Sequence, residues 1–115
     1  MAPSSKQLVA LLVITLVAMA PFTADASCAL VVATAAACGP YMTHAKNTIS
    51  KDCCTALGKS VDALHTKADR VEACNCLKTA ISEVKGFDYG RADAVHKQCK
   101  TAYPFPLDKS YDCSK

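Results

Sequence analysis

The residues Cys53-Cys54 and Cys74-Asn75-Cys76 decide how this chain folds. Adjacent cysteines on a helix point about 100° apart, because about 3.6 residues make one turn. Cys53 and Cys54 can hardly bond to each other, so each should tie its helix to a different neighbour. Cys74 and Cys76 would lie about 200° apart on a helix and should also take different partners. Two helices that each send cross-links in two directions form a centre to which the rest of the chain can be attached.

The start of the chain has the layout of a secretory signal peptide. The apolar stretch LVALLVITLVAMA at residues 8–20 precedes the small-x-small cleavage pattern ADA at residues 24–26. With 13 residues, the apolar stretch is too short for a membrane anchor, which needs about 20. We therefore expect residues 1–26 to be a signal peptide, cleaved after Ala26 or alternatively after Ala24. Residues 27–115 should form one secreted domain.

The cysteine count predicts a cross-linked domain. The 115 residues include eight cysteines, an even number, which in an exported chain indicates four disulfides. A metal site explains these cysteines poorly, since no C-x-x-C pair occurs and none of the three histidines lies at zinc-finger spacing. No cofactor is expected. Four cross-links at about 2–4 kcal/mol each would dominate the stability of so small a domain and would tolerate a hollow interior.

Two helices are expected in the first half of the domain. The Ala-rich segment from Leu30 to about Thr43 favours a helix, with a kink or an early end at Gly39-Pro40. Ser50 can cap a second helix that ends near His65. The apolar stripe of this second helix follows a spacing of three and four residues and consists of Cys53, Leu57, Val61 and Leu64.

Two further helices are expected in the second half. Thr66 and Asp69 have the spacing of a capping box, which should open a third helix that Gly86 ends. A fourth helix should follow Asp88 or Gly90. The apolar face of the third helix carries Val71, Cys74, Leu77, Ile81 and Val84, its water-facing side mostly carries Arg70, Lys78, Ser82 and Glu83, and the fourth helix holds Ala92, Val95 and Cys99.

The C-terminal segment should be an irregular tail. Pro104 and Pro106 rule out a helix there. The tail also carries Tyr103, Phe105 and Leu107, which should face inward once the tail folds back and a disulfide of Cys113 tethers it. The predicted fold is therefore all-α, with four short helices, four disulfides and an irregular tail. Periodicity alone favours a filled core, because spacing does not distinguish a filled core from one that encloses a ligand.

Composition and motifs exclude several classes of function. No Ser/His/Asp constellation or pair of carboxylates stands out, so the sequence predicts that the protein is not an enzyme. The net charge of +3 is small and evenly spread, which argues against nucleic acid as a partner. It gives at most a mild preference for anionic surfaces.

The complete cysteine spacing carries a family signature. It reads C-x9-C-x14-CC-x19-C-x-C-x22-C-x13-C from Cys28 to Cys113 and resembles that of the plant non-specific lipid-transfer proteins. The polar Asn75 and the long gap before the seventh cysteine are similar to the type 1 branch of that family. Residues 66–70 and 73–78 also resemble the motifs of that branch. A single CC or C-x-C pair would be weak evidence, whereas the seven gaps together are specific.

The resemblance implies a fold and a site. Four helices would surround a long apolar tunnel, or internal hydrophobic cavity, covered by the tail. Arg70 would lie near the tunnel mouth, within reach of a lipid head group, although a solvated residue at a helix start explains it equally well. The implied disulfides are Cys28–Cys76, Cys38–Cys53, Cys54–Cys99 and Cys74–Cys113. The residues expected to contact lipid are Leu57, Val61, Leu64, Arg70, Ile81, Val84, Phe87, Val95, Tyr103, Phe105 and Leu107.

The chain departs from the second motif of the family, near its C-terminal end. Where the family has Pro-Tyr-x-Ile-Ser, this chain has Pro104-Phe105-Pro106-Leu107-Asp108. Phe105 lacks the tyrosine hydroxyl that can bond to a lipid, and Asp108 adds a negative charge that would repel fatty carboxylates. These departures concern ligand preference more than fold.

We therefore interpret the chain as a secreted, extracellular protein of the cell wall or apoplast. It would act as a monomer that carries fatty acids, lysolipids or phospholipids in its interior, with at most peripheral contact with anionic membranes. Two other classes stay open: a cationic antimicrobial defence protein that acts on membranes, and an inhibitor of a protease or amylase. The net charge of only +3 argues against the first class, and the cysteine spacing argues against the second.

Overall fold

The structure is a computed structural model, and it describes residues 26–115. The expected signal peptide lies outside the described residues except for Ala26. Within the described residues, the structure has no strand and consists of the helices α2 (Ala26–Met42), α3 (Lys51–Asp62), α4 (Lys67–Ser82) and α5 (Tyr89–Cys99), followed by an irregular tail. The predicted all-α fold is confirmed.

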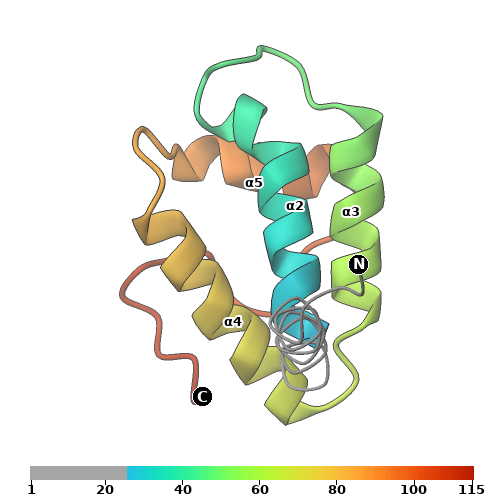
Figure 1. The fold of residues 1–115 in the computed structure, drawn as a ribbon, viewed down its shortest axis with the longest axis vertical. Coiled ribbons are helices and arrows are strands. Elements are labelled where there is room, and N and C mark those ends of the chain that lie inside the picture. The colour runs from blue at the N-terminus through green and yellow to red at the C-terminus, as the bar shows by residue number, and fades with distance from the viewer. Residues whose placement is uncertain (1–25) are drawn as a thin grey trace, which may run out of the picture.

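Helix α2 is the centre of the helical arrangement. It contacts α3, α4 and α5. In Figure 1, α3 and α4 flank α2 on opposite sides, α5 crosses behind its upper end, and the tail runs back past α4. From the sequence, the two helices with paired cysteines were expected to form the centre of the fold, and these are α3 and α4. The structure instead places α2 between them, because α2 buries residues toward both neighbours.

The start of α2 and its continuation through Pro40 differ from the expectation, whereas its end at Met42 is close to the expected end near Thr43. The helix begins at Ala26, before the predicted Leu30, and continues through Pro40 to Met42. The early end expected at Gly39-Pro40 is therefore wrong. Proline removes only one backbone donor, and here the loss falls in the last turn. The Gly39 and Pro40 carbonyls accept hydrogen bonds from the loop that follows, and His44, at φ 67°, turns the chain away.

The other helix starts follow the predicted capping residues. The Ser50 hydroxyl accepts a hydrogen bond from the Cys53 N–H at 3.1 Å. Thr66 and Asp69 form both bonds of the capping box, each at 3.1 Å. The helix ends are less well predicted: α3 stops at Asp62 rather than near His65, and α4 stops at Ser82, before Gly86.

Polar contacts fix α5 against the end of α2. Asp88, one of the two predicted candidates, caps α5 by accepting bonds from the N–H groups of Gly90 and Arg91. The Asp88 carboxylate also lies 2.8 Å from His44 Nε2. The Arg91 guanidinium donates to the Tyr41 carbonyl at 3.0 Å and lies over the Tyr41 ring. These contacts also set the position of the α4–α5 loop, which borders the site described below.

Four disulfides cross-link the described chain, with no free cysteine among its residues. Both cysteine pairs diverge as the helix geometry predicts: α3 is linked to α2 and α5, whereas α4 is linked to α2 and the tail. The four pairs are those that the resemblance implies, namely Cys28–Cys76, Cys38–Cys53, Cys54–Cys99 and Cys74–Cys113.

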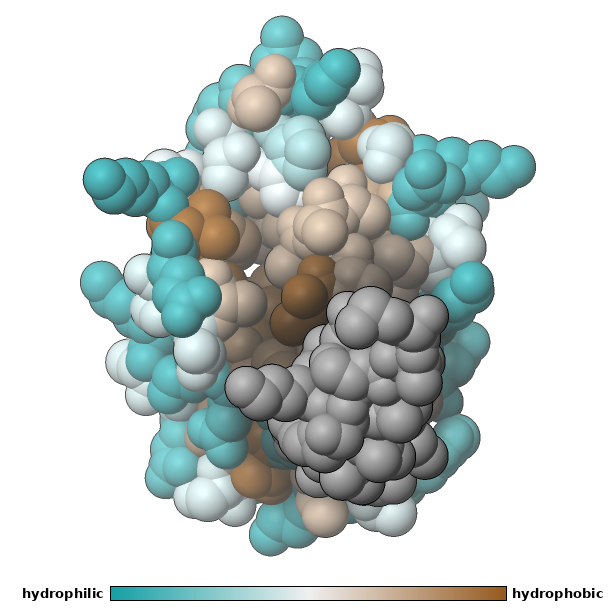
Figure 2. All heavy atoms as spheres, viewed as in Figure 1, coloured by the Kyte–Doolittle hydropathy of each residue, from teal (hydrophilic) through white to brown (hydrophobic). Residues whose placement is uncertain are grey.

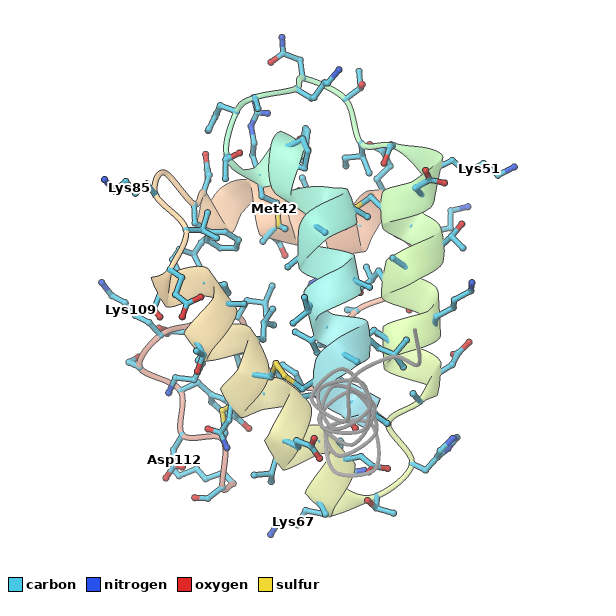
Figure 3. All side chains as sticks on the ribbon, viewed as in Figure 1. Met42, Lys51, Lys67, Lys85, Lys109 and Asp112 are labelled. Carbon is cyan, nitrogen blue, oxygen red and sulfur yellow. A yellow bond between two sulfur atoms is a disulfide. The ribbon has the colours of Figure 1, made fainter. Side chains whose placement is uncertain are left out.

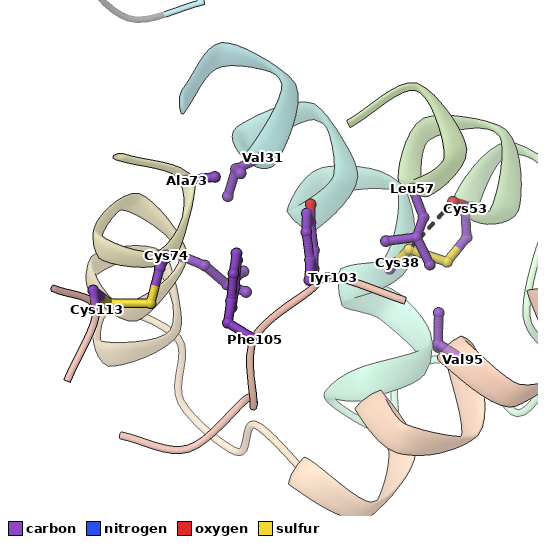
Figure 4. Packing of buried hydrophobic residues seen from close by; sticks show 11 residues of the cluster. Val31, Cys38, Cys53, Leu57, Ala73, Cys74, Val95, Tyr103, Phe105 and Cys113 are labelled. Carbon is purple, nitrogen blue, oxygen red and sulfur yellow. Dashed lines mark hydrogen bonds between the residues drawn. A yellow bond between two sulfur atoms is a disulfide. The ribbon is translucent and has the colours of Figure 1, made fainter. Parts of the chain in front are cut away.

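The core lies between the helices and the folded-back tail. Its buried residues include Val31 of α2, Leu57 of α3 and Val95 of α5, together with Tyr103 and Phe105 of the tail (Figure 4). On the face drawn in Figure 2, apolar residues gather in the middle and hydrophilic ones surround them. No helix within residues 26–115 combines the length and apolar character needed to cross a membrane.

Candidate functional site

An apolar cavity of about 330 Å³ lies between the second half of α4, the α4–α5 loop and the tail. Its volume is at the lower end of the range of about 300–1,000 Å³ typical of ligand pockets. Most of its wall is aliphatic or aromatic. The apolar lining consists of Leu77 and Ile81 from α4, Val84 and Phe87 from the loop, Tyr89 at the start of α5, and Phe105, Pro106 and Leu107 from the tail.

The sequence of the tail explains how it forms one wall of this cavity. In extended backbone, successive side chains point to opposite sides. Tyr103 and Phe105 are buried and Leu107 is half-buried, whereas Pro104 and Pro106 between them are exposed. The two prolines exclude a helix, the chain bends at Pro104 and Phe105, and Pro106 also belongs to the cavity lining. The alternation therefore turns three apolar side chains inward, as the sequence predicts.

Two contacts with α4 hold the far end of the tail. Cys113 is bonded to Cys74, and Lys78 Nζ donates a hydrogen bond to the Tyr111 carbonyl at 2.6 Å. Lys78 was expected to point mostly toward water, and this expectation is wrong: the side chain is half-buried beneath the tail. Cys74 and Lys78 are four residues apart and therefore share one face of α4.

The rim of the cavity is polar and carries both signs of charge. Lys78, Asp108 and Lys109 belong to its lining. Hydrogen bonds from the Ser110 N–H and hydroxyl, with smaller contributions from the charges of Lys109 and Lys78, hold the pKa of Asp108 below its usual value. Asp108 is therefore ionised at neutral pH. In Figure 3 the Lys109 side chain extends outward from the tail, on the same side of the molecule as Lys85.

The inner wall of the cavity is a stacked pair of aromatic rings. The rings of Phe105 and Tyr103 have centroids 5.2 Å apart and lie within 12° of parallel. Phe105 lines the cavity, whereas Tyr103 lies behind it, and its hydroxyl donates a hydrogen bond to Ser60 Oγ at 2.8 Å. Burial raises the pKa of Tyr103, opposed in part by hydrogen bonds with Ser60 and Thr34. The phenol is therefore neutral at physiological pH.

The structure brings together some of the expected lipid-contacting residues and separates others. Ile81, Val84, Phe87, Phe105 and Leu107 line the cavity. Leu57, Val95 and Tyr103 are buried in the packed core, and Val61 and Leu64 pack against its edge. Val84 lies beyond the end of α4 and is 39% exposed, contrary to its expected place on the helix.

Arg70 lies at a different hollow from the apolar cavity. That hollow measures about 160 Å³ and includes Lys67 and Lys115 in its lining. Cys74 and Phe105 line both spaces, so the two are neighbours on either side of these residues. Arg70 itself is not part of the lining of the apolar cavity.

Sequence reasoning missed several members of the site. Leu77 was assigned to the apolar face of its helix but not to the site, and Lys78 was assigned to solvent. A signal for Lys78 exists, since its spacing from Cys74 places it beside the cysteine that tethers the tail. Pro106 and Lys109 offer no comparable signal, because the return path of the tail decides their position. Tyr89 offers none because its place depends on how α5 packs against the end of α2. No group of three or more His, Cys, Asp or Glu side chains suited to a metal ion occurs in the described part of the chain.

The chain matches one protein-family model over most of its length. Residues 28–113 match the model of the "Protease inhibitor/seed storage/LTP family". A non-specific lipid-transfer protein of Beta vulgaris is 32% identical over 103 residues, covering 90% of this chain and 87% of the relative. Non-specific lipid-transfer protein 3 of Lens culinaris is 35% identical over 104 residues, covering 90% and 87%.

Solved structures of similar fold include proteins with bound lipid. The structure of the allergen Art v 3 is 33% identical in sequence, with a TM-score of 0.67, and the match covers 76% of this chain and 95% of that one. Non-specific lipid transfer protein 1 from barley, solved in complex with a lysophosphatidylcholine, matches with a TM-score of 0.69 and 23% identity over 76% of this chain and 96% of that one. The wheat protein complexed with two phospholipid molecules matches with a TM-score of 0.66 and 24% identity, at the same coverage. At these identities the barley and wheat matches show a shared fold.

Proposed function

The chain belongs to the protease inhibitor, seed storage and lipid-transfer protein family, and because the relatives compared above are non-specific lipid-transfer proteins, we propose that it binds and carries lipids. The observation that supports the site most directly is the apolar cavity between α4 and the tail. A disulfide ties the tail over this cavity, so the wall can stay in place when the interior is empty.

The proposed mechanism is partition of an acyl chain from water into the cavity, without covalent chemistry. Burying about a dozen methylenes is worth on the order of 10 kcal/mol, at about 0.8 kcal/mol each. Association itself costs about 4–15 kcal/mol, so micromolar or weaker affinity is expected. Such affinity permits both loading and release. A cavity at the small end of the usual range favours a single acyl chain over two.

The polar rim would receive the lipid head group. Lys78 and Lys109 offer positive charge to a phosphate or carboxylate, and Asp108 opposes the carboxylate more than a zwitterionic head group. We therefore favour lysolipids and phospholipids over free fatty acids as ligands. Arg70, in the neighbouring hollow, is the alternative head-group contact. Because most of the contact is apolar, the site should accept several kinds of head group.

The proposed setting is extracellular. The signal-peptide pattern and the four disulfides support secretion into the cell wall or apoplast. We propose that the mature protein acts as a monomer and touches anionic membranes only during loading and release. Its net charge of +3 would favour that contact.

Displacement of a fluorescent fatty-acid probe from the oxidised protein tests the proposal. Lysophosphatidylcholine should displace the probe saturably, and reduction of the disulfides should abolish binding. If the correctly oxidised protein binds neither the probe nor lysophosphatidylcholine, the lipid-carrier function is refuted. Leakage of anionic vesicles at similar protein concentrations would instead support the antimicrobial alternative, and stoichiometric inhibition of a protease or amylase would support the inhibitor alternative.

A further inference from the structure

Tyr103 occupies the middle of the molecule, between the cavity and the packed core. Its side chain is 7% exposed, and its hydroxyl donates to the Oγ of Ser60, which is 1% exposed. Thr34 of α2 is buried nearby and lies 3.1 Å from the Ala56 carbonyl of α3. In Figure 4 the Tyr103 ring stands between Phe105 and the group that contains Leu57.

The cavity ends at the Phe105 ring, and the Tyr103 ring lies directly behind it. Phe105 lines the cavity on one side, and Tyr103 is stacked on Phe105 but is not part of the lining. Leu57 and Val95, which the family resemblance assigns to a long tunnel, are closely packed in the core and are 1% and 3% exposed. The space that could continue the cavity toward α3 and α5 is therefore occupied by side chains.

We propose that Tyr103 is a specificity-determining residue, which closes the inner end of the cavity and limits the length of the acyl chain that the protein accepts. This inference rests on the proposed lipid-binding function. Short acyl chains would be enclosed completely, whereas the end of a longer chain would remain in water at the rim.

The hydrogen bond to Ser60 makes this wall firmer than an aliphatic side chain would be. A longer acyl chain could advance only by displacing the stacked rings and separating the Tyr103 hydroxyl from Ser60. Both hydroxyl groups would then lose this hydrogen bond in an apolar interior, which is costly. A leucine or valine at this position could rotate aside without losing a polar contact. Tyr103 and its hydrogen bond to Ser60 together therefore set the inner limit of the cavity.

Affinity measured across a series of lysophosphatidylcholines with saturated acyl chains of increasing length tests this proposal. For the native protein, each added methylene should strengthen binding about fourfold until the cavity is full, after which the affinity should level off. Tyr103→Ala should move this plateau to longer chains. Tyr103→Leu is a second truncation that keeps more of the core contact, and it should also move the plateau. Val95→Ala, a core truncation outside the cavity, should leave the plateau at its native length.

The possible outcomes separate this inference from the proposed function. The inference would be supported if the affinity of the native protein levels off at one chain length and levels off at a longer one in both Tyr103 variants, with all four disulfides formed. A native affinity that rises along the whole series would overturn it. Tyr103 variants that keep the native plateau, or a Val95→Ala variant that shifts it equally, would also overturn it. Complete absence of lysophosphatidylcholine binding by the native protein would refute the proposed function itself.

Discussion

At the scale of single residues, the apolar side chains of the interior divide into two groups. Ile81 and Leu107 face the cavity, where an acyl chain would touch them, whereas Leu57 and Val95 face only other side chains. Truncation of a residue in the first group should affect ligand binding, and truncation of one in the second should affect stability. This division can be tested one residue at a time.

Ile81→Ala should weaken lipid binding with a modest effect on the fold. The substitution removes apolar contact from the cavity wall, and at about 0.8 kcal/mol per methylene the loss of affinity should be roughly tenfold or more. Displacement of the fluorescent probe measures it. Val32→Ala is the matched control, because Val32 lies on α2 with 54% of its surface exposed and is not part of this cavity. Equal weakening by both substitutions would place the ligand elsewhere.

Ser60→Ala should destabilise the fold through Tyr103. The substitution removes the 2.8 Å partner of the buried phenol hydroxyl and leaves it only Thr34, and loss of a buried hydrogen bond costs about 0.5–1.5 kcal/mol. Chemical unfolding of the oxidised protein measures the change in the free energy of unfolding. Tyr103→Phe together with Ser60→Ala removes both hydroxyls and should recover part of the loss. A single Ser60 substitution with no effect would contradict the role of this hydrogen bond.

At the scale of helices and tail, capping carboxylates make the fold sensitive to acid. The hydrogen bond with His44, followed by those from the Arg91 and Gly90 N–H groups, lowers the pKa of Asp88 from its ordinary value of 3.8. The hydrogen bond from the Thr66 N–H is the largest cause of the lowered pKa of Asp69. Because the folded carboxylates bind protons less readily than the unfolded ones, their stabilisation is present above pH 3.8 and is lost as the pH falls through their lowered pKa values.

The melting temperature should therefore fall on acidification below that pH. Asp88→Asn keeps an oxygen acceptor at the start of α5 but cannot titrate, so its melting temperature should depend less on pH in this range. Thermal unfolding followed by circular dichroism over a series of acidic pH values measures both curves. Parallel curves for the native protein and the variant would show that Asp88 does not contribute to the acid sensitivity.

The two disulfides that leave the C-x-C motif of α4 should differ in their effect on function. Cys74–Cys113 ties the tail over the cavity, whereas Cys28–Cys76 ties α2 to α4 and lines no part of that cavity. Replacing either pair by serines should lower the free energy of unfolding by about 2–5 kcal/mol. Only loss of the Cys74–Cys113 bond should also weaken probe binding at temperatures where the variant is folded. Equal weakening by both replacements would argue against the tail as a cavity wall.

At the scale of the whole molecule, the helix caps and the directions of the cysteines could be predicted from the sequence. Which apolar residues line the cavity and which fill the core could not. Ser50, Thr66 and Asp69 could be assigned as caps because capping depends on residues three positions apart. The cysteine divergence was equally predictable, since it follows from the helical repeat. The continuation of α2 to Met42 depended instead on the following loop, whose N–H groups bond to the Gly39 and Pro40 carbonyls at the helix end.

The position of the cavity depends on contacts between distant segments. The tethered, folded-back tail was predicted to turn Tyr103 and Phe105 inward, and both are buried. Whether each ring meets the cavity or the core depends on where the tail crosses α3 and α4. No pattern in the sequence gives the meeting of Tyr103 with Ser60, which is 43 residues away. Leu57 and Val95, which the family resemblance assigns to the tunnel, lie outside the lining of the cavity, and their contact with lipid stays a prediction.

The central claim is that the cavity between α4 and the tail holds the acyl chain, and intermolecular nuclear Overhauser effects test it most directly. The oxidised, isotope-labelled protein would be saturated with lysophosphatidylcholine whose acyl protons can be observed. We expect contacts from the acyl chain to the methyl groups of Ile81 and Leu107, and none to those of Val95. Contacts to Val32 on the outer surface of α2, with none to Ile81 or Leu107, would contradict the claim.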